Sequence, residues 1–142
     1  MSDSKFDDVS IYDCTSQWGV FSIAGPKSRN FLKKLVVSED PDKTLSNKEF
    51  PWLSYRDIEI GMCPVRALRV AYTGELGWEL HHPIEMQNYL LDILLSSGEE
   101  FNLKLVGARA QNWLRQEKSY KAFGSDLGRD AGPFESNLSR FV

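Results

Sequence analysis

An apolar stripe at helical spacing runs through residues 83–98, and a helix with such a stripe needs an apolar surface to cover. Between Pro83 and Gly98, the apolar residues that recur at i, i+3, i+4, i+7 and i+8 are Met86, Tyr89, Leu90, Ile93 and Leu94. The three runs before it are rich in β-branched and aromatic residues and predict strands at 53–60, 65–72 and 78–81. We therefore expect a β-sheet with this helix packed against it.

The rest of the chain adds strands and helices to this plan. Residues 9–12 alternate between apolar and polar side chains and 18–23 form a second apolar run, so both are predicted to be strands. Pro26 suits the first turn of a helix that continues to about Val36, and residues 38–46 are predicted to be a flexible connection.

A further helix is predicted from Gly107 to Tyr120. Its predicted inward residues are Ala110, Trp113 and Leu114, and its polar residues are Arg109, Gln111, Arg115, Glu117 and Lys118. Strands mixed with helices in this order predict the α+β class, with helices on a sheet.

Length and charge restrict the function further. A chain of 142 residues fits a single domain, and a net charge of −3 argues against nucleic acid and membrane partners. No signal peptide and no apolar stretch of ~20 residues is evident. We expect a cytoplasmic protein, or a mitochondrial matrix protein in a eukaryote. Cys14 and Cys63 are expected to be reduced and structural.

The nonapeptide at 72–80, Tyr-Thr-Gly-Glu-Leu-Gly-Trp-Glu-Leu, places Glu75 between Gly74 and Gly77 directly after a predicted strand. Glycine accepts positive φ and allows close backbone approach, so this turn can present a carboxylate to a ligand. A hairpin turn with a solvated Glu75 is the alternative. A carboxylate can accept two parallel N–H bonds from the amidine-like edge of a pterin or purine ring.

Other chemistries have less support. His81 and His82 are adjacent and are expected on opposite faces of a strand, so no metal site is predicted. No Gly-x-Ser-x-Gly elbow and no glycine-rich phosphate loop is present. Arg115 could serve an anionic or carbonyl group of the ligand of Glu75, or could be a solvated helix residue or part of an ion pair.

The motifs at 72–80, 107–109, 114–118 and 123–127 resemble, in order and spacing, those of the aminomethyltransferase family, the T-protein of the glycine cleavage system and its relatives. Residues 21–29 and 133–138 are similar to further segments of that family, so the resemblance spans nearly the whole chain. Within the family, the chain is most similar to the folate-binding C-terminal part of dimethylglycine and sarcosine dehydrogenases.

This resemblance implies a ferredoxin-like arrangement, as in the central domain of T-protein, and a tetrahydrofolate site. Tetrahydrofolate would capture the one-carbon unit released from an N-methyl amine. By residue-by-residue transfer, Glu75 would hold the pterin ring edge, Tyr72 would flank the ligand and Arg115 would lie near the folate pocket. Any FAD of the parent enzyme would be bound outside this chain.

The sequence also departs from the family pattern. The family's aspartate that engages the folate amine has no counterpart before Val9, and the family continues past the segment at 133–138. We therefore expect residues 1–142 to be one domain of a larger folate-binding unit, to contact its remaining domains, and to have no catalytic residue and no activity alone. A non-catalytic regulatory module that keeps the T-protein-like scaffold is the alternative, and a domain with no ligand is the third possibility.

Overall fold

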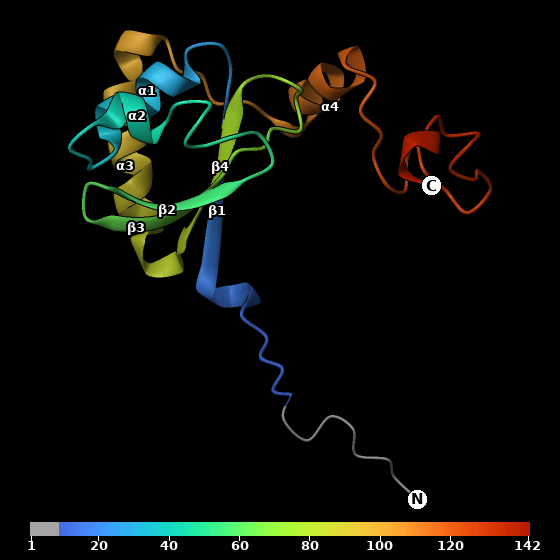
Figure 1. Cartoon of the computed structure of the whole chain (residues 1–142), viewed down its shortest axis with the longest axis horizontal. Coiled ribbons are helices and arrows are strands. Elements are labelled where there is room, and N and C mark those ends of the chain that lie inside the picture. Colours follow the sequence, from blue (N-terminus) through green and yellow to red (C-terminus); the bar gives the residue numbers. More distant parts are fainter. Residues whose placement is uncertain (1–8) are drawn as a thin grey trace, which may run out of the picture.

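Among residues 9–142, which the computed structural model describes, four strands form one antiparallel sheet in the order β1-β4-β3-β2 (Figure 1). The strands are β1 (Trp18–Ala24), β2 (Tyr55–Ile60), β3 (Cys63–Leu68) and β4 (Gly77–Pro83). β1 pairs with β4 along its whole length. β2 and β3 form a hairpin whose turn holds Gly61 at a φ of +59°, a conformation that glycine adopts easily.

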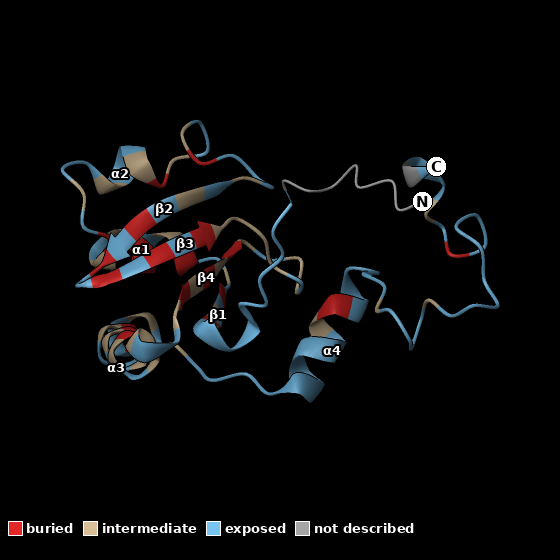
Figure 2. Ribbon diagram, turned by 90° about the horizontal axis from the view of Figure 1, so that it is seen from below, coloured by how far each residue is buried: buried red, intermediate tan, exposed pale blue. Residues whose placement is uncertain are grey.

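Two helices, α1 (Ser28–Leu35) and α3 (Gln87–Gly98), supply apolar side chains to the core on one face of this sheet. Burial alternates along β4: Trp78, Leu80 and His82 are inaccessible to solvent, whereas Glu79 and His81 between them are partly exposed. Figure 2 shows the buried residues concentrated on the sheet and on these helices. The α+β class, with helices packed against a sheet, is confirmed.

The remaining helices are shorter or lie at the margin of this core. They are α2 (Pro41–Thr44), α4 (Ala108–Glu117) and four 3₁₀ turns, η1 (Thr15–Gln17), η2 (Ile84–Met86), η3 (Glu99–Phe101) and η4 (Ser139–Phe141). The helix predicted over 83–98 is confirmed, with η2 as its first turn and α3 as its body. Within residues 9–142, no helix combines the length and the apolar character needed to cross a bilayer.

The strand predicted at 9–12 is wrong. Residues 9–12 are exposed and belong to no strand, and β4 is the only partner of β1 in the described sheet. An alternating pattern forms a strand only where a neighbouring strand can accept its backbone hydrogen bonds, and none lies beside these residues.

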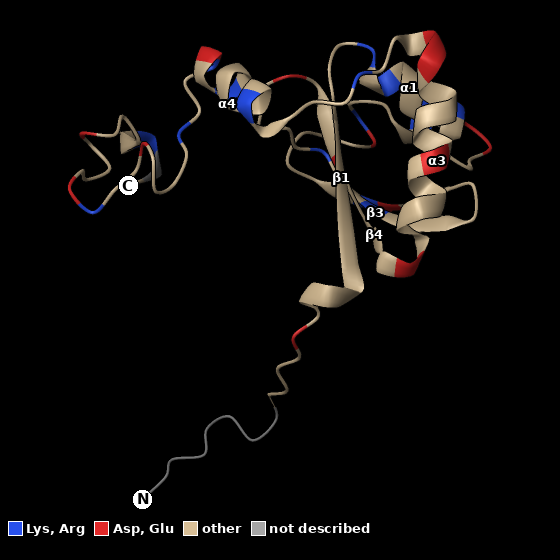
Figure 3. Ribbon diagram, turned by 180° about the vertical axis from the view of Figure 1, so that it is seen from behind, with Lys and Arg blue, Asp and Glu red and all other residues tan. Residues whose placement is uncertain are grey.

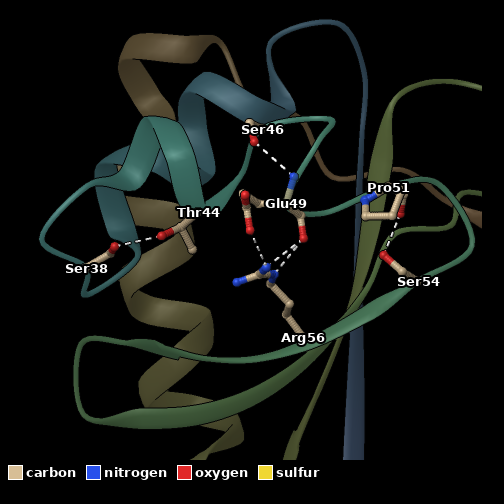
Figure 4. Close-up of polar contacts among 7 residues, drawn as sticks. All are labelled: Ser38, Thr44, Ser46, Glu49, Pro51, Ser54 and Arg56. Carbon is tan, nitrogen blue, oxygen red and sulfur yellow. Dashed lines mark hydrogen bonds and ion pairs between the residues drawn. The ribbon is translucent and has the colours of Figure 1, made fainter.

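The flexible connection predicted at 38–46 is also wrong, because local hydrogen bonds order it (Figure 4). The carboxylate of Asp40 caps α2 by accepting from the backbone N–H of Lys43 at 2.9 Å, and the hydroxyls of Ser38 and Thr44 are 2.8 Å apart. Leu45, directly after α2, is fully buried in the core. The polar residues of this segment therefore cap α2 and bond to one another, and they do not indicate mobility.

A second network holds the chain between α2 and β2 (Figure 4). The guanidinium of Arg56 donates to the backbone carbonyl of Glu49 at 2.9 Å and 2.6 Å, and lies 3.3 Å from the carboxylate of the same residue. The hydroxyl of Ser46 accepts from the backbone N–H of Glu49 at 3.1 Å. Two polar side chains thus fix a loop that places Phe50 in the core.

Helix α4 lies apart from α1 and α3, as Figure 1 and Figure 3 show. Its predicted inward face is wrong: Trp113 is 68% exposed, Ala110 is exposed and Leu114 is half-buried, whereas Arg115 is only 3% exposed. The helix turns Arg115 inward because polar partners surround the guanidinium there, and hydrogen bonds satisfy a buried cation as apolar contacts cannot.

Candidate functional site

The loop between β3 and β4, residues 69–76, carries Glu75 on a turn that two glycines shape in different ways. Gly74 has a φ of +71°, and its N–H donates to the carbonyl of Ala71 at 3.1 Å. A Cβ at Gly77 would lie 2.6 Å from the carbonyl oxygen of Ile23, at the end of β1. Gly74 therefore permits the turn, whereas Gly77 permits close approach of the neighbouring strand.

The predicted strand at 65–72 ends earlier, at Leu68, so Tyr72 belongs to this loop. The pairing of the hairpin continues one residue further, to Arg69: its N–H donates to the carbonyl of Ser54 at 2.9 Å, and its carbonyl accepts from Leu53 at 3.2 Å. Local bonds replace the sheet pairing after Arg69, since the N–H of Val70 donates to the carbonyl of Leu68 at 2.9 Å, and the turn follows.

A cavity of about 610 Å³ opens beside the loop, and Thr73 and Glu75 line it. Its other walls come from residues 21–28 at the end of β1, from residues 101–106, from Phe31 of α1, from leucines of α3, and from Gln111 and Leu114 of α4. The hydroxyl oxygen of Thr73 is buried and has no hydrogen-bond partner among residues 9–142. A mostly apolar cavity with a few convergent polar groups is typical of a site for a small organic molecule.

Glu75 is half-exposed and forms an ion pair with Lys118. Its Oε1 lies 3.3 Å from Nζ of Lys118, the residue that directly follows α4, and the two side chains are 41% and 44% exposed. The aliphatic part of Lys118 crosses Gly74 so closely that a Cβ there would lie 2.4 Å from its Cγ. The carboxylate of Glu75 is thus held beside the cavity by an ion pair that solvent can reach.

Lys118 is predicted from the sequence only as a polar residue of the helix, not as a residue of the site. One signal could have found it. Lys118 follows Arg115 by three residues, and residues three apart lie on the same face of a helix.

Arg115 lies inside the structure, where its donors are taken by neighbouring groups. Its Nε and Nη2 donate to Oδ1 of Asn112 at 2.9 Å and 2.6 Å, and its Nη1 donates to the carbonyl of Tyr120 at 2.7 Å and to the carboxylate of Asp126. Arg115 therefore ties α4 to residues 118–126, and of the alternatives left open by the sequence the structure favours the ion pair.

Tyr72 connects the Glu75 turn to the segment held by Arg115. Its hydroxyl donates to the carbonyl of Lys121 at 3.0 Å, and the guanidinium carbon of Arg115 lies 6.0 Å from the centroid of its ring. The ring centroids of Tyr72 and Tyr120 are 6.5 Å apart. The structure thus brings Tyr72, Glu75 and Arg115 into one neighbourhood, although of these three only Glu75 lines the cavity.

Asp126 is a second residue of this neighbourhood that the sequence patterns do not predict. The backbone N–H of Ala122 donates to its carboxylate at 2.8 Å, and this bond, followed by the one from Arg115, lowers the pKa of Asp126 below 3.8. The carboxylate closes the loop after α4.

Neither the two histidines nor the two cysteines line this cavity. The side chains of His81 and His82 are partly exposed and fully buried, respectively, and no group of three potential metal ligands is found in this range. Both cysteines are free, as predicted, and burial raises the pKa of the Cys63 thiol. Cys14 is exposed, so its predicted structural role is wrong.

Several known proteins have similar sequences over nearly the whole of this chain. Mitochondrial dimethylglycine dehydrogenase of Homo sapiens is 40% identical over 135 residues, which cover 95% of this chain and 15% of the human protein. Mitochondrial sarcosine dehydrogenase of Homo sapiens is 33% identical over 91% of this chain and 14% of that protein. An aminomethyltransferase of Chlorobium limicola is 31% identical over 96% of this chain and 36% of that protein.

The chain thus spans 15% of the length of the dimethylglycine dehydrogenases that it matches. The family whose members are described as the GCVT N-terminal domain matches residues 1–142. These matches confirm the resemblance to aminomethyltransferases and to dimethylglycine and sarcosine dehydrogenases, which the motifs around Glu75 and Arg115 indicated. The chain belongs to the GCVT N-terminal domain family.

Proposed function

We propose that this chain is the tetrahydrofolate-binding domain, over residues 1–142, of a one-carbon transfer enzyme such as a dimethylglycine or sarcosine dehydrogenase. The observation that carries the proposal is the carboxylate of Glu75, which lines a cavity of about 610 Å³ on a turn that Gly74 makes possible. The relatives act as dehydrogenases and aminomethyltransferases according to their names, and the proposal extends that chemistry to this chain.

The residues around the cavity fit a reduced folate. The half-exposed carboxylate of Glu75 can accept two parallel N–H bonds from the 2-amino and N3 edge of a pterin. The hydroxyl of Thr73 is buried and has no partner in the described part of the chain, and a polar ring substituent would satisfy it. The apolar walls suit the faces of the ring system, because burial of apolar surface stabilises the complex.

Tyr72 and Arg115 have supporting roles in this proposal. Arg115 holds residues 118–126 against α4, and Tyr72 joins the same segment through its hydroxyl. Together they keep the Glu75 turn and the end of α4 at a fixed separation beside the folate pocket. Arg115 does so without donating to the ligand, since its guanidinium already bonds Asn112, Tyr120 and Asp126.

Bound tetrahydrofolate supplies a nucleophilic amine that captures a one-carbon unit. The residues of this chain bind and orient the pterin: Glu75 fixes the ring edge, Thr73 adds a hydrogen bond and the apolar wall excludes water. The oxidation that releases the one-carbon unit, with any FAD, belongs to other domains of the parent enzyme. By analogy with relatives whose names place them in mitochondria, the matrix is the proposed location in a eukaryote.

Calorimetry with tetrahydrofolate under anaerobic conditions tests the proposal. Glu75→Ala is expected to weaken binding about 10- to 100-fold, the effect of losing hydrogen bonds to a charged group. Glu79→Gln is the matched control, because Glu79 is also acidic and partly exposed but does not line the cavity. Equal affinity of Glu75→Ala and the unmodified chain would contradict the folate site.

The second candidate function is a regulatory or interaction module that keeps the scaffold. The observation that favours it is the internal satisfaction of Arg115, together with the pairing of Glu75 with Lys118. This candidate requires that the unmodified chain bind no tetrahydrofolate, so the same calorimetry separates the two functions.

A further inference from the structure

We propose that Lys118 sets the ligand specificity of the cavity by competing for Glu75. In the absence of a ligand, its ammonium occupies the carboxylate that the pterin ring edge uses, and binding requires it to withdraw. The proposal deepens the folate site and rests on it. Its basis is the contact of 3.3 Å between Nζ of Lys118 and Oε1 of Glu75.

The structure holds the backbone and the stem of Lys118 in place. The backbone N–H of Lys118 donates to the carbonyl of Arg115 at 3.2 Å, which caps the end of α4. Arg115 is itself buried, so the base of the lysine is fixed. Gly74 leaves room for the aliphatic stem, because any Cβ there would lie 2.4 Å from Cγ of Lys118. The charged end is thereby directed to Glu75 rather than free in solvent.

The charged end itself can move. The side chain of Lys118 is 44% exposed, and Glu75 is the only acidic side chain within ion-pair distance of it among residues 9–142. An exposed pair of this kind contributes little to stability, since water solvates both charges well. Lys118 can therefore leave Glu75 at low cost and extend into solvent while its stem still lies over Gly74.

The competition discriminates between ligands by the number and geometry of their donors. An ammonium is a compact point charge, whereas a flat amidine-like edge presents two parallel N–H groups that match both carboxylate oxygens. A ligand with two such donors on one edge replaces the Lys118 contact with a better one. A ligand with a single donor gains no more from Glu75 than Lys118 already provides, so Lys118 selects against it.

The first test compares tetrahydrofolate binding by the unmodified chain and by Lys118→Gln. Removing the competitor should tighten binding by about two- to fivefold, the range that an exposed ion pair allows. Lys118→Arg keeps the charge and adds two parallel N–H donors that match both carboxylate oxygens, so it should compete better than lysine and bind tetrahydrofolate more weakly than the unmodified chain. Lys121→Gln removes one positive charge three residues away, where only the backbone carbonyl of Lys121 contacts Tyr72, and should leave binding unchanged.

A second test follows the amine of Lys118 in the unmodified chain and does not depend on the folding of a variant. Saturating tetrahydrofolate should increase the rate at which an acylating reagent labels Lys118 by at least about twofold, as peptide mass spectrometry would measure, because the ammonium loses its partner. Labelling of Lys48, which lies outside the cavity wall, provides the internal reference.

The outcomes separate this inference from the proposed function. Tetrahydrofolate binding by the unmodified chain with equal or weaker binding by Lys118→Gln, or with slowed or unchanged labelling of Lys118, overturns the competition and leaves the folate site standing. An absence of binding by both the unmodified chain and Lys118→Gln overturns the folate site and this inference together. Tighter binding by Lys118→Gln with faster labelling supports both.

Discussion

Arg115 and Glu75 lie on two segments that contact each other. Arg115 belongs to α4 and the loop that follows it, and Glu75 belongs to the turn between β3 and β4. Arg115 is 3% exposed and bonds three groups of its own segment, whereas Glu75 is 41% exposed and has, among the residues that the structure describes, a single partner at 3.3 Å. The donors of Arg115 are thus satisfied within its own segment, whereas the carboxylate of Glu75 has only an exposed ion pair with Lys118. A charged residue in a family motif can therefore act by building a site or by contacting its ligand, and burial with satisfied partners distinguishes the two roles.

The largest expected effect is that of Arg115→Met, which leaves the carbonyl of Tyr120 and the side chain of Asn112 without their donor. Loss of these bonds should destabilise the local structure of residues 118–126 by about 1–3 kcal/mol. Hydrogen exchange of the amides of this segment should accelerate accordingly. Arg109→Met, on an exposed position of the same helix, is the control. Unchanged exchange in Arg115→Met would mean that this segment is held by something other than Arg115.

A smaller effect is expected from Gly74→Ala. The substitution puts a side chain on a residue with a φ of +71°, which costs about 1–2 kcal/mol, and it forces the stem of Lys118 to move. The midpoint of denaturant unfolding should fall, and labelling of Lys118 should rise without any ligand. Gly128→Ala is the matched control, since Gly128 has no positive φ and its nearest atom would be 3.9 Å from a Cβ. If both variants unfold alike, the turn does not depend on the conformation of Gly74.

The contact between Asp126 and Ala122 should be lost in acid. Because the folded-state pKa of Asp126 lies below 3.8, its contribution to stability is fully present above pH 3.8 and disappears as the pH falls through the lower, folded-state value. The amide proton signal of Ala122 should therefore titrate below pH 3.8 in NMR spectra. Asp126→Asn should abolish this titration. An amide signal that stays constant from pH 6 to pH 2 would argue against the hydrogen bond.

The smallest effect is that of Glu75→Gln on folding. Its ion pair with Lys118 is exposed, so the free energy of unfolding should change by less than about 0.5 kcal/mol. Binding of tetrahydrofolate should fall by a much larger factor. Urea unfolding of the variant without ligand checks the first expectation, and a loss of stability as large as that of Arg115→Met would show that Glu75 is as structural as Arg115.

Much of the fold could be predicted because local patterns and the core agreed. The stripe from Met86 to Leu94 predicted α3, and Leu90 and Leu94 are buried as the pattern requires. The prediction failed at 9–12, where alternation had no partner strand, and at α4, where the thin apolar face gave no reliable direction. Propensity records local preference, and tertiary partners decide which preference is satisfied.

The candidate site, like the fold, was predicted in part from local sequence patterns. The two glycines around Glu75 predicted a turn that presents a carboxylate, and the structure places Glu75 on such a turn beside a cavity. Neither the cavity nor the pairing of Glu75 with Lys118 could be predicted, because the two residues are far apart in the sequence and meet only when α4 closes over the turn.

The sequence by itself determined that this chain forms helices on a sheet and carries the motifs of its family, because strand and helix periodicities and glycine positions are local properties of the chain. Only the tertiary structure decided which polar side chains are buried, which are paired and which can still bind a ligand. The burial of Arg115, the unpartnered hydroxyl of Thr73 and the lysine that lies against Glu75 each result from distant segments packing together, and the same residue types elsewhere on the surface would be solvated by water.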